Sequence, residues 1–148
     1  MRPRLIASGD QCLIVEFGDT IEIDTNREAL AFAAHLTRAH IEGVTDIVPS
    51  HIGVGIHYRA EALSTRGEEH PHQAIARIVR CLLREPLDPS ATTTRVVDIP
   101  VCLGGAHGED LIATAALLGL DVDELVSSFV ANPLDVLMIG FAPGQPYL

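Results

Sequence analysis

The chain has 148 residues, of which 47% are hydrophobic, and it carries a formal net charge of −10. This length and composition allow one ordinary domain or two small ones with a buried core, and they argue against disorder. All ten basic residues are arginine, which excludes lysine-dependent phosphate loops and Schiff-base enzymes. Because an acidic chain repels phosphate backbones, we also expect no nucleic-acid partner.

Cellular location is indicated by what the sequence does not contain. No stretch is long and apolar enough to cross a bilayer, and Asp10 interrupts the apolar run after the basic start too early for a signal peptide. The three cysteines, Cys12, Cys81 and Cys102, are widely spaced and odd in number, which fits a reducing compartment. We therefore expect a cytoplasmic protein with no membrane partner.

The first part of the chain predicts the element order β-β-α-β-β-α. Short apolar runs bounded by turn residues predict the strands, and apolar residues at helical spacing predict the helices. This order suits a small sheet with two helices on one face. The predicted strands are 5–7, 12–17, 44–48 and 53–58, and the helices run from Asp24 or Thr25 to about Ala39 and from Pro71 to Arg84.

A Pro- and Thr-rich linker then predicts two domains, 1–89 and 90–148. The second part predicts strands at 95–101 and 134–141 and helices at 110–118 and 121–131. Asp121, with Glu124 three residues later, forms a capping-box pattern at the start of the last helix.

The second part does not complete a sheet of its own. Two strands cannot close a barrel, and an isolated pair is marginal in water. Residues 96–148 also carry seven acidic side chains and no basic one. We therefore expect either that a partner covers this segment or that the chain once continued beyond Leu148.

Several motifs along the chain resemble those of one family. Gly9-Asp10 and residues 13–18 resemble its opening hairpin, and Asn26 stands early in the first predicted helix, as it usually does in the family. Residues 99–111 are similar to the signature "IPVCYGG…GPDL", and residues 140–148 to "GF-x-PGFPYL". By their order and spacing the chain resembles the amino-terminal part of the KipI-like proteins. This family is also known as allophanate hydrolase subunit 1 or as the B subunit of 5-oxoprolinase, of the carboxyltransferase subdomain C and D type.

The resemblance implies an α+β fold, with a small two-layer α/β amino-terminal domain followed by the first part of a cyclophilin-like β-barrel domain. It also implies a component of a heteromeric, ATP-dependent amidohydrolase of the 5-oxoprolinase type, which opens 5-oxoproline to glutamate. The implied partner is similar to allophanate hydrolase subunit 2, also known as the C subunit of 5-oxoprolinase. The assembled complex would use ATP, and this chain itself would hold no cofactor.

Two other functions are compatible with the same resemblance. One is a non-catalytic binding module that inhibits a sensor histidine kinase, in the manner of KipI. The other is a carboxyltransferase piece of a biotin-dependent enzyme of the urea carboxylase type.

The glycine-rich run at 104–110 is the first candidate site. Gly104, Gly105 and Gly108 free the backbone N–H groups to approach a small-molecule ligand just before a helix amino terminus. His107 and Asp110 could move a proton and are the candidate catalytic residues. The alternative is a tight turn in which Asp110 caps the helix.

The run at 140–147 is the second candidate site. Gly140, Phe141, Pro143, Gly144 and Tyr147 could line a ligand pocket on a rigid Pro-Gly turn, or the run could simply be a β-turn between strands.

The remaining reactive side chains suggest simpler roles. No cysteine or carboxylate stands at ligand spacing to the histidines at 51, 57, 70 and 72, so we predict no metal site. Cys102, beside glycines, could be a nucleophile, but its position favours a buried apolar cysteine at a strand end.

Overall fold

The computed structural model describes residues 3–87 and 95–148, and its contacts divide the chain into two units. The first unit comprises Met1–Thr93 together with Val136–Leu148, and the second comprises Thr94–Asp135. The predicted boundary between residues 89 and 90 lies outside the described residues.

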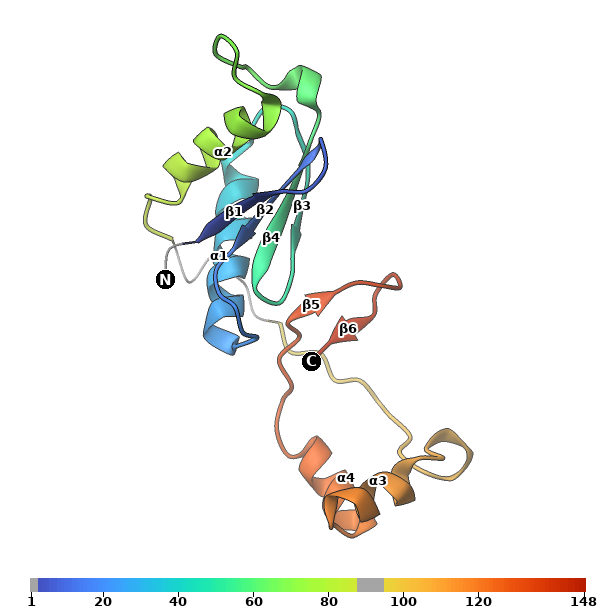
Figure 1. The fold of residues 1–148 in the computed structure, drawn as a ribbon. Helices are drawn as coiled ribbons and strands as arrows, with labels where there is room; N and C mark the ends of the chain where they lie inside the picture. Colours follow the sequence, from blue (N-terminus) through green and yellow to red (C-terminus); the bar gives the residue numbers. More distant parts are fainter. Residues whose placement is uncertain (1–2, 88–94) are drawn as a thin grey trace. The chain divides into compact units, whose positions relative to one another are not determined.

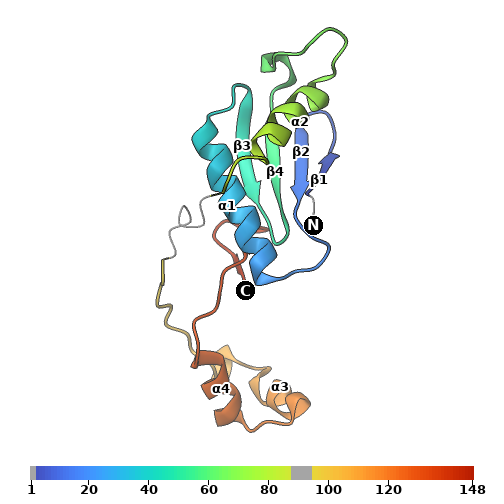
Figure 2. The same cartoon turned by 90° about the vertical axis from the view of Figure 1, so that its left-hand side faces the viewer.

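The first unit is built on a four-stranded antiparallel sheet with the strand order β1-β2-β4-β3. Helices α1 and α2 both cover one face of this sheet (Figures 1 and 2). The predicted order β-β-α-β-β-α and the α+β class of this part are therefore confirmed. The elements are β1 (Arg4–Ala7), β2 (Cys12–Glu16), α1 (Ile23–Ala39), β3 (Val44–Pro49), β4 (Gly53–Tyr58), the short 3-10 helix η1 (Ala60–Ala62) and α2 (Pro71–Leu82).

The core follows from the alternation of side chains along the two central strands. Leu13 in β2 lies opposite Ile56 in β4, and both are almost completely buried. Paired residues of an antiparallel sheet share a face. Because both of these side chains are buried, they lie on the face that the helices cover. Phe32 of α1 is fully buried against it and meets Phe17 edge to face, with ring centroids 5.5 Å apart. Burial of a phenylalanine side chain contributes about 2 kcal/mol to stability.

The first helix starts earlier than its capping residues predicted. The N-cap is Glu22, which has an extended backbone and makes no side-chain capping bond, so the predicted caps Asp24 and Thr25 are wrong. Asp24 lies instead in the first turn, where its carboxylate interacts favourably with the positive end of the helix.

A small hairpin near the end of the chain also belongs to the first unit. It pairs β5 (Met138–Ile139) with β6 (Pro146–Tyr147). The predicted strand 134–141 is therefore much shorter than expected. The second strand was not predicted, because turn-forming residues surround its two positions.

The side chain of Asn26 joins this hairpin to the main sheet. The residue is only 3% exposed, in the first turns of α1. Its amide nitrogen donates to the carbonyl oxygens of Ser50 and His51, at 3.1 Å each, and to that of Leu137 at 2.9 Å. An amide has two N–H donors, so one of them is shared between two acceptors. One side chain thus fixes the β3–β4 turn and the start of the hairpin.

The second unit contains η3 (Gly105–His107), α3 (Leu111–Leu118) and α4 (Val122–Val130). The capping box of α4 is confirmed, because Asp121 accepts from the Glu124 N–H at 2.7 Å and Glu124 accepts from the Asp121 N–H at 3.0 Å. The predicted strand 95–101 is wrong, since these residues form no strand. Strand propensity is realised only where another strand pairs with it, and no described residue does so here. The predicted barrel part of the fold is not seen in the described residues.

The second unit has almost no core of its own. Among its described residues only Ala115 is buried, and most of the exposed large apolar side chains described in the chain belong to this unit. The described helices include none that is long and apolar enough to cross a membrane.

The Asn26 hydrogen bonds predict a large cost for a small substitution. Asn26→Ala would leave three carbonyl groups without their donor, and we expect a loss of about 1–3 kcal/mol in the free energy of unfolding. Asn26→Asp should cost more, because a carboxylate would face carbonyl oxygens. Urea unfolding followed by circular dichroism measures both, with exposed Asn132→Ala as the matched control. Equal midpoints for the Asn26→Ala and Asn132→Ala variants would contradict this role.

The three thiols should differ in reactivity. Burial raises the pKa of Cys12, so at a given pH less of it is the reactive thiolate. Cys81 and Cys102 are exposed. At pH 8 we expect two thiols to react rapidly with a chromogenic disulfide and one to react slowly, and Cys12→Ser should remove only the slow phase. Three equal rates in the folded protein would show that Cys12 is not protected.

Candidate functional site

The predicted residues of the carboxyl-terminal motif meet in the β5–β6 hairpin. Its tip is a tight turn closed by the Gln145 N–H, which donates to the Ala142 carbonyl at 3.0 Å. Pro143 and Gly144 occupy its central positions, and Gly144 has a φ of +82°. This combination is typical of a type II turn, whose third position needs a positive φ. The β-turn interpretation is therefore confirmed, and it leaves a ligand role open.

Phe141 has an unusual conformation within this hairpin. Its φ is +61°, and its side chain is 94% exposed. A left-handed backbone is uncommon for a bulky residue and costs about 1–3 kcal/mol. Exposure of a large aromatic ring adds no packing energy to offset that cost. The geometry therefore presents an aromatic ring on a rigid turn, available for contact with a ligand or a partner.

Tyr147 anchors the other end of the hairpin. It pairs with Met138 in the sheet register and is half-buried. Its ring meets that of His51 edge to face, with centroids 5.8 Å apart. His51 belongs to the β3–β4 turn that also accepts from Asn26. The hairpin is therefore held by a hydrogen bond from Asn26 to Leu137, just before β5, and by the contact of Tyr147 with His51.

The glycine-rich loop in the second unit is shaped by contacts between its own residues. A Cβ atom at Gly108 would lie 2.8 Å from the Gly104 nitrogen, so the turn requires glycine there. Gly105 has a φ of +58°, which glycine adopts without strain. The N–H groups of His107 and Gly108 donate to the carbonyls of Gly104 and Gly105. A ligand would have to use other N–H groups of the loop, such as that of Gly105.

His107 and Asp110 are both exposed on this loop. Asp110 takes the N-cap position of α3, but its side chain makes no capping hydrogen bond, so the expected cap interaction is wrong. Its carboxylate is thus not used by the helix. Cys102 is also exposed and lies outside any strand, which overturns the expectation of a buried cysteine at a strand end.

The structure gathers the ten predicted site residues into two groups. Gly104, Gly105, His107, Gly108 and Asp110 form the loop of the second unit. The other five form the hairpin of the first unit. Within the described parts of the chain, no three His, Cys, Asp or Glu side chains are grouped as metal ligands would be. The proposed roles of both groups stay predictions.

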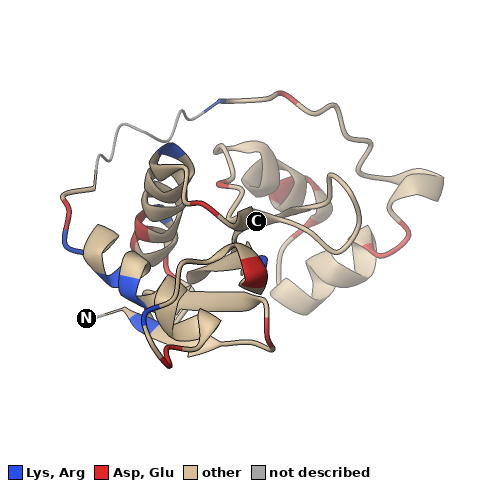
Figure 3. Ribbon diagram, turned by 90° about the horizontal axis from the view of Figure 1, so that it is seen from above, with Lys and Arg blue, Asp and Glu red and all other residues tan. Residues whose placement is uncertain are grey.

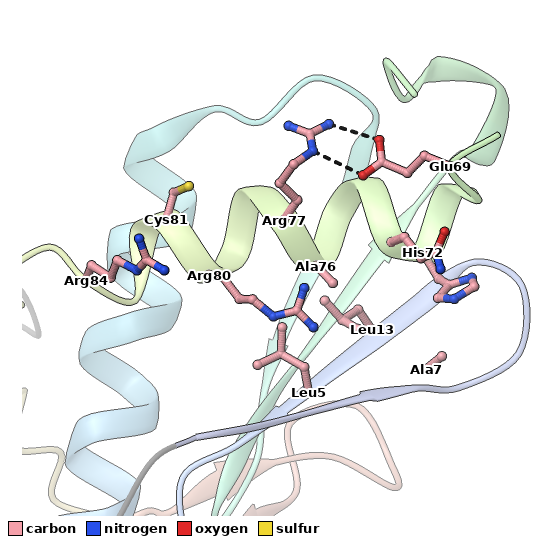
Figure 4. Close-up of a pocket in the computed structure, with 11 residues that line it drawn as sticks. Leu5, Ala7, Leu13, Glu69, His72, Ala76, Arg77, Arg80, Cys81 and Arg84 are labelled. Carbon is pink, nitrogen blue, oxygen red and sulfur yellow. Dashed lines mark hydrogen bonds and ion pairs between the residues drawn. The ribbon is translucent and has the colours of Figure 1, made fainter. Parts of the chain in front are cut away.

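A groove that the sequence did not predict lies between α2 and the β1–β2 hairpin. It encloses about 670 Å³. Leu5, Ala7 and Leu13 form its apolar floor, and α2 forms its wall (Figure 4). The residues lining the wall come from α2 and from the positions just before and after it; they are Glu69, His72, Gln73, Ala76, Arg77, Arg80, Cys81 and Arg84.

The arginines of this groove differ in their partners. The Nε of Arg77 lies 3.1 Å from Glu69 Oε1, and its Nη2 lies 3.3 Å from Oε2. This hydrogen-bonded guanidinium holds the pKa of Glu69 below its ordinary value. Arg80 and Arg84 form no ion pair with any carboxylate of the described residues. In Figure 4 the Arg80 side chain extends from α2 towards Leu5.

A sequence signal for this groove does exist. Arg77, Arg80 and Arg84 are spaced three and four residues apart, which places them on one side of a helix. The same spacing fits an ordinary solvated helix face, so it does not reveal the groove without the neighbouring strand. Figure 3 shows basic positions on α2 and at the start of β1, whereas the charged positions of α4 are all acidic and α3 has none.

Comparison with known proteins agrees with this architecture. Over 143 residues the chain is 29% identical to the B subunit of 5-oxoprolinase from Bacillus subtilis (strain 168), a match covering 95% of this chain and 60% of that protein. It is 28% identical over 149 residues to the B subunit of 5-oxoprolinase from Escherichia coli O157:H7, covering 99% of this chain and 63% of the relative. The chain thus spans about three fifths of the length of these two relatives.

A solved structure supports the fold. A crystal structure of TTHA0988 superimposes with a TM-score of 0.72 and 31% sequence identity, covering 92% of this chain and 25% of that chain. Residues 3–148 also match the family described as the carboxyltransferase domain, subdomain C and D. Because this match covers nearly the whole chain, the resemblance seen in the motifs is confirmed, and the protein belongs to the carboxyltransferase domain family, subdomain C and D.

Proposed function

We propose that this chain is one component of a 5-oxoprolinase-type amidohydrolase, which opens 5-oxoproline to glutamate at the expense of ATP. The observation that carries the proposal is the match to two proteins named as B subunits of 5-oxoprolinase, which covers 95% and 99% of this chain. Their name describes a component of a larger assembly. ATP would be used by that assembly rather than by this chain, which has no Walker-type phosphate loop.

The exposed apolar side chains of the second unit support the presence of a partner protein. Side chains such as Val96, Ile112 and Leu117 are 74–87% exposed, which is unusual for residues of this size. Exposed apolar surface of this kind favours burial against another polypeptide. The partner we propose is similar to the C subunit of 5-oxoprolinase. Because residues 96–148 carry acidic and no basic side chains, its contacting surface should be basic at the rim.

The reaction needs a group that transfers a proton and a group that binds the substrate carboxylate, and the glycine-rich loop could supply both. Hydrolysis of the cyclic amide adds water to the ring carbonyl carbon, breaks the ring C–N bond and places a proton on the departing nitrogen. The exposed His107 and Asp110 are suited to carry that proton, and a free N–H such as that of Gly105 is suited to bind the substrate carboxylate. Phe141 would contact the substrate or the partner protein.

The direct test is reconstitution. The chain is co-expressed with the proposed partner and with the ATP-using component, and glutamate release from 5-oxoproline is measured with and without ATP. We expect release only with ATP and the complete set of components. No release from the complete set would overturn the proposal.

Substitutions in the loop separate catalysis from assembly. His107→Ala and Asp110→Asn should each lower kcat by about 10²-fold or more, because they remove a proton-transfer group. Co-purification with the partner should be unchanged. Exposed Glu28→Gln in α1 of the first unit is the matched control and should retain full activity. Wild-type kcat in both loop variants would remove these residues from the mechanism.

Gly108→Ala tests the shape of the loop. The added Cβ would lie 2.8 Å from the backbone nitrogen of Gly104, so the turn must shift. We expect reduced glutamate release, whereas Gly104→Ala meets no atom within 4 Å and should be milder. The ratio of the two activities in the reconstituted complex measures this difference, and equal activities would show that the loop geometry does not matter.

A further inference from the structure

The groove between α2 and β1 has the form of a strand-binding groove. Strand β1 is at the edge of the sheet and pairs with β2 on one side only among the described elements. The other edge strand, β3, carries a register shift between Val44 and Asp46 and ends at Pro49, two features that discourage further pairing. The described part of β1 carries neither feature, and its outer edge lies beside a groove.

The hydrogen-bond register shows which groups of β1 point outward. The Ser8 N–H donates to the Cys12 carbonyl at 2.9 Å, so these two residues form a hydrogen-bonded pair. Such pairs alternate along an antiparallel ladder, which makes Ile6 with Ile14 and Arg4 with Glu16 the next ones. The backbone N–H and C=O groups of Leu5 and Ala7 therefore face away from β2. A fifth strand would bond to these groups.

The side chains of the same residues line the groove. Leu5 lies opposite Val15, and Ala7 opposite Leu13, on the face that the helices cover. A strand added beside β1 would direct alternate side chains onto this face, next to α2. There it would meet Arg80 and Arg84, the two arginines of the groove that form no ion pair with a described carboxylate.

We infer that this groove binds an extended, acidic segment of a partner protein by adding it to the sheet as a strand next to β1. Main-chain bonds to Leu5 and Ala7 would supply affinity, as in other cases of β-augmentation. Charge pairing with Arg80 and Arg84 would select carboxylate side chains at alternate positions. The inference concerns a surface of the first unit, and it does not depend on the proposed enzymatic activity.

The test uses the 148-residue chain and fluorescein-labelled heptapeptides in which Glu alternates with one of several apolar residues. Fluorescence polarisation measures their affinity, with the same peptides carrying Lys in place of Glu as the matched control. We expect the acidic set to bind at least about tenfold more tightly than the basic set, and to weaken as salt is raised. Equal or absent binding by the two sets would overturn the inference.

Backbone methylation distinguishes a strand from a loosely bound acid. A strand donates to β1 from every second nitrogen only, so methylating one alternate set of nitrogens should abolish binding and methylating the other should be tolerated. Loss on methylating the Glu nitrogens indicates antiparallel addition, and loss on methylating the apolar residues indicates parallel addition. Equal binding by both methylated peptides, or displacement of the parent peptide by equimolar glutarate, would instead show a small-molecule anion site and overturn the inference.

Variants locate the site. Arg80→Glu with Arg84→Glu should weaken peptide binding by at least about tenfold, and Arg27→Glu on exposed α1 surface should not change it. Ala7→Pro removes one outward N–H without touching a β1–β2 bond, and should also weaken binding.

Hydrogen exchange of the wild-type chain provides a readout that needs no variant. Exchange at the amides of Leu5 and Ala7 should slow when the acidic peptide binds. Unchanged exchange at both amides in a saturated complex would overturn strand addition.

Discussion

The arrangement of the first unit depends on the buried amide of Asn26. Its nitrogen binds carbonyl groups from two turns that are far apart in the sequence, at residues 50–51 and at residue 137. A buried polar group without partners would cost about 1–3 kcal/mol, so the three carbonyls and the amide stabilise one another only when all are in place. The hairpin that carries Phe141 takes its position from this contact. The strained aromatic residue is thus held on a fixed support rather than on a free tail.

The elements of the first unit could be predicted because the apolar face of each one is buried against another element of the same unit. The alternating residues of β2 and β4 pair with each other, and the apolar stripe of α2 packs on the face they form. The segment 95–101 has an equally strong strand pattern and no strand. The β propensity of a segment shows only that it can form a strand. Whether it does so depends on a neighbouring strand that the local sequence does not specify. The reverse happened at β6, where pairing with Met138 made a strand out of Pro146 and Tyr147.

Among the candidate sites, too, those formed by local sequence could be predicted and those formed by distant segments could not. The glycine loop and the terminal hairpin were visible in the sequence because glycine and proline restrict the backbone locally, and Gly108 and Gly144 indeed take positions that need glycine. The groove beside α2 was missed. Three arginines at helical spacing look like solvated surface until β1 is known to be an edge strand. That fact depends on the order of four strands, which no single segment encodes. The role of Asn26 was similarly hidden, since its partners lie 24, 25 and 111 residues away.

The chain path through the two units links their behaviour. Because residues 136–148 return to the first unit, the segment Thr94–Asp135 is tethered at both ends to the same body. Docking of the hairpin therefore closes a loop. A fully flexible loop of this length would cost about 3 kcal/mol in chain entropy beyond a constant term, and helices α3 and α4 already reduce that cost. Anything that stiffens the tethered segment before docking reduces this cost. A polypeptide that binds α3 and α4 would then make docking of the hairpin on the sheet more favourable. By reciprocity, a change that weakens docking of the hairpin would lower the affinity for that polypeptide.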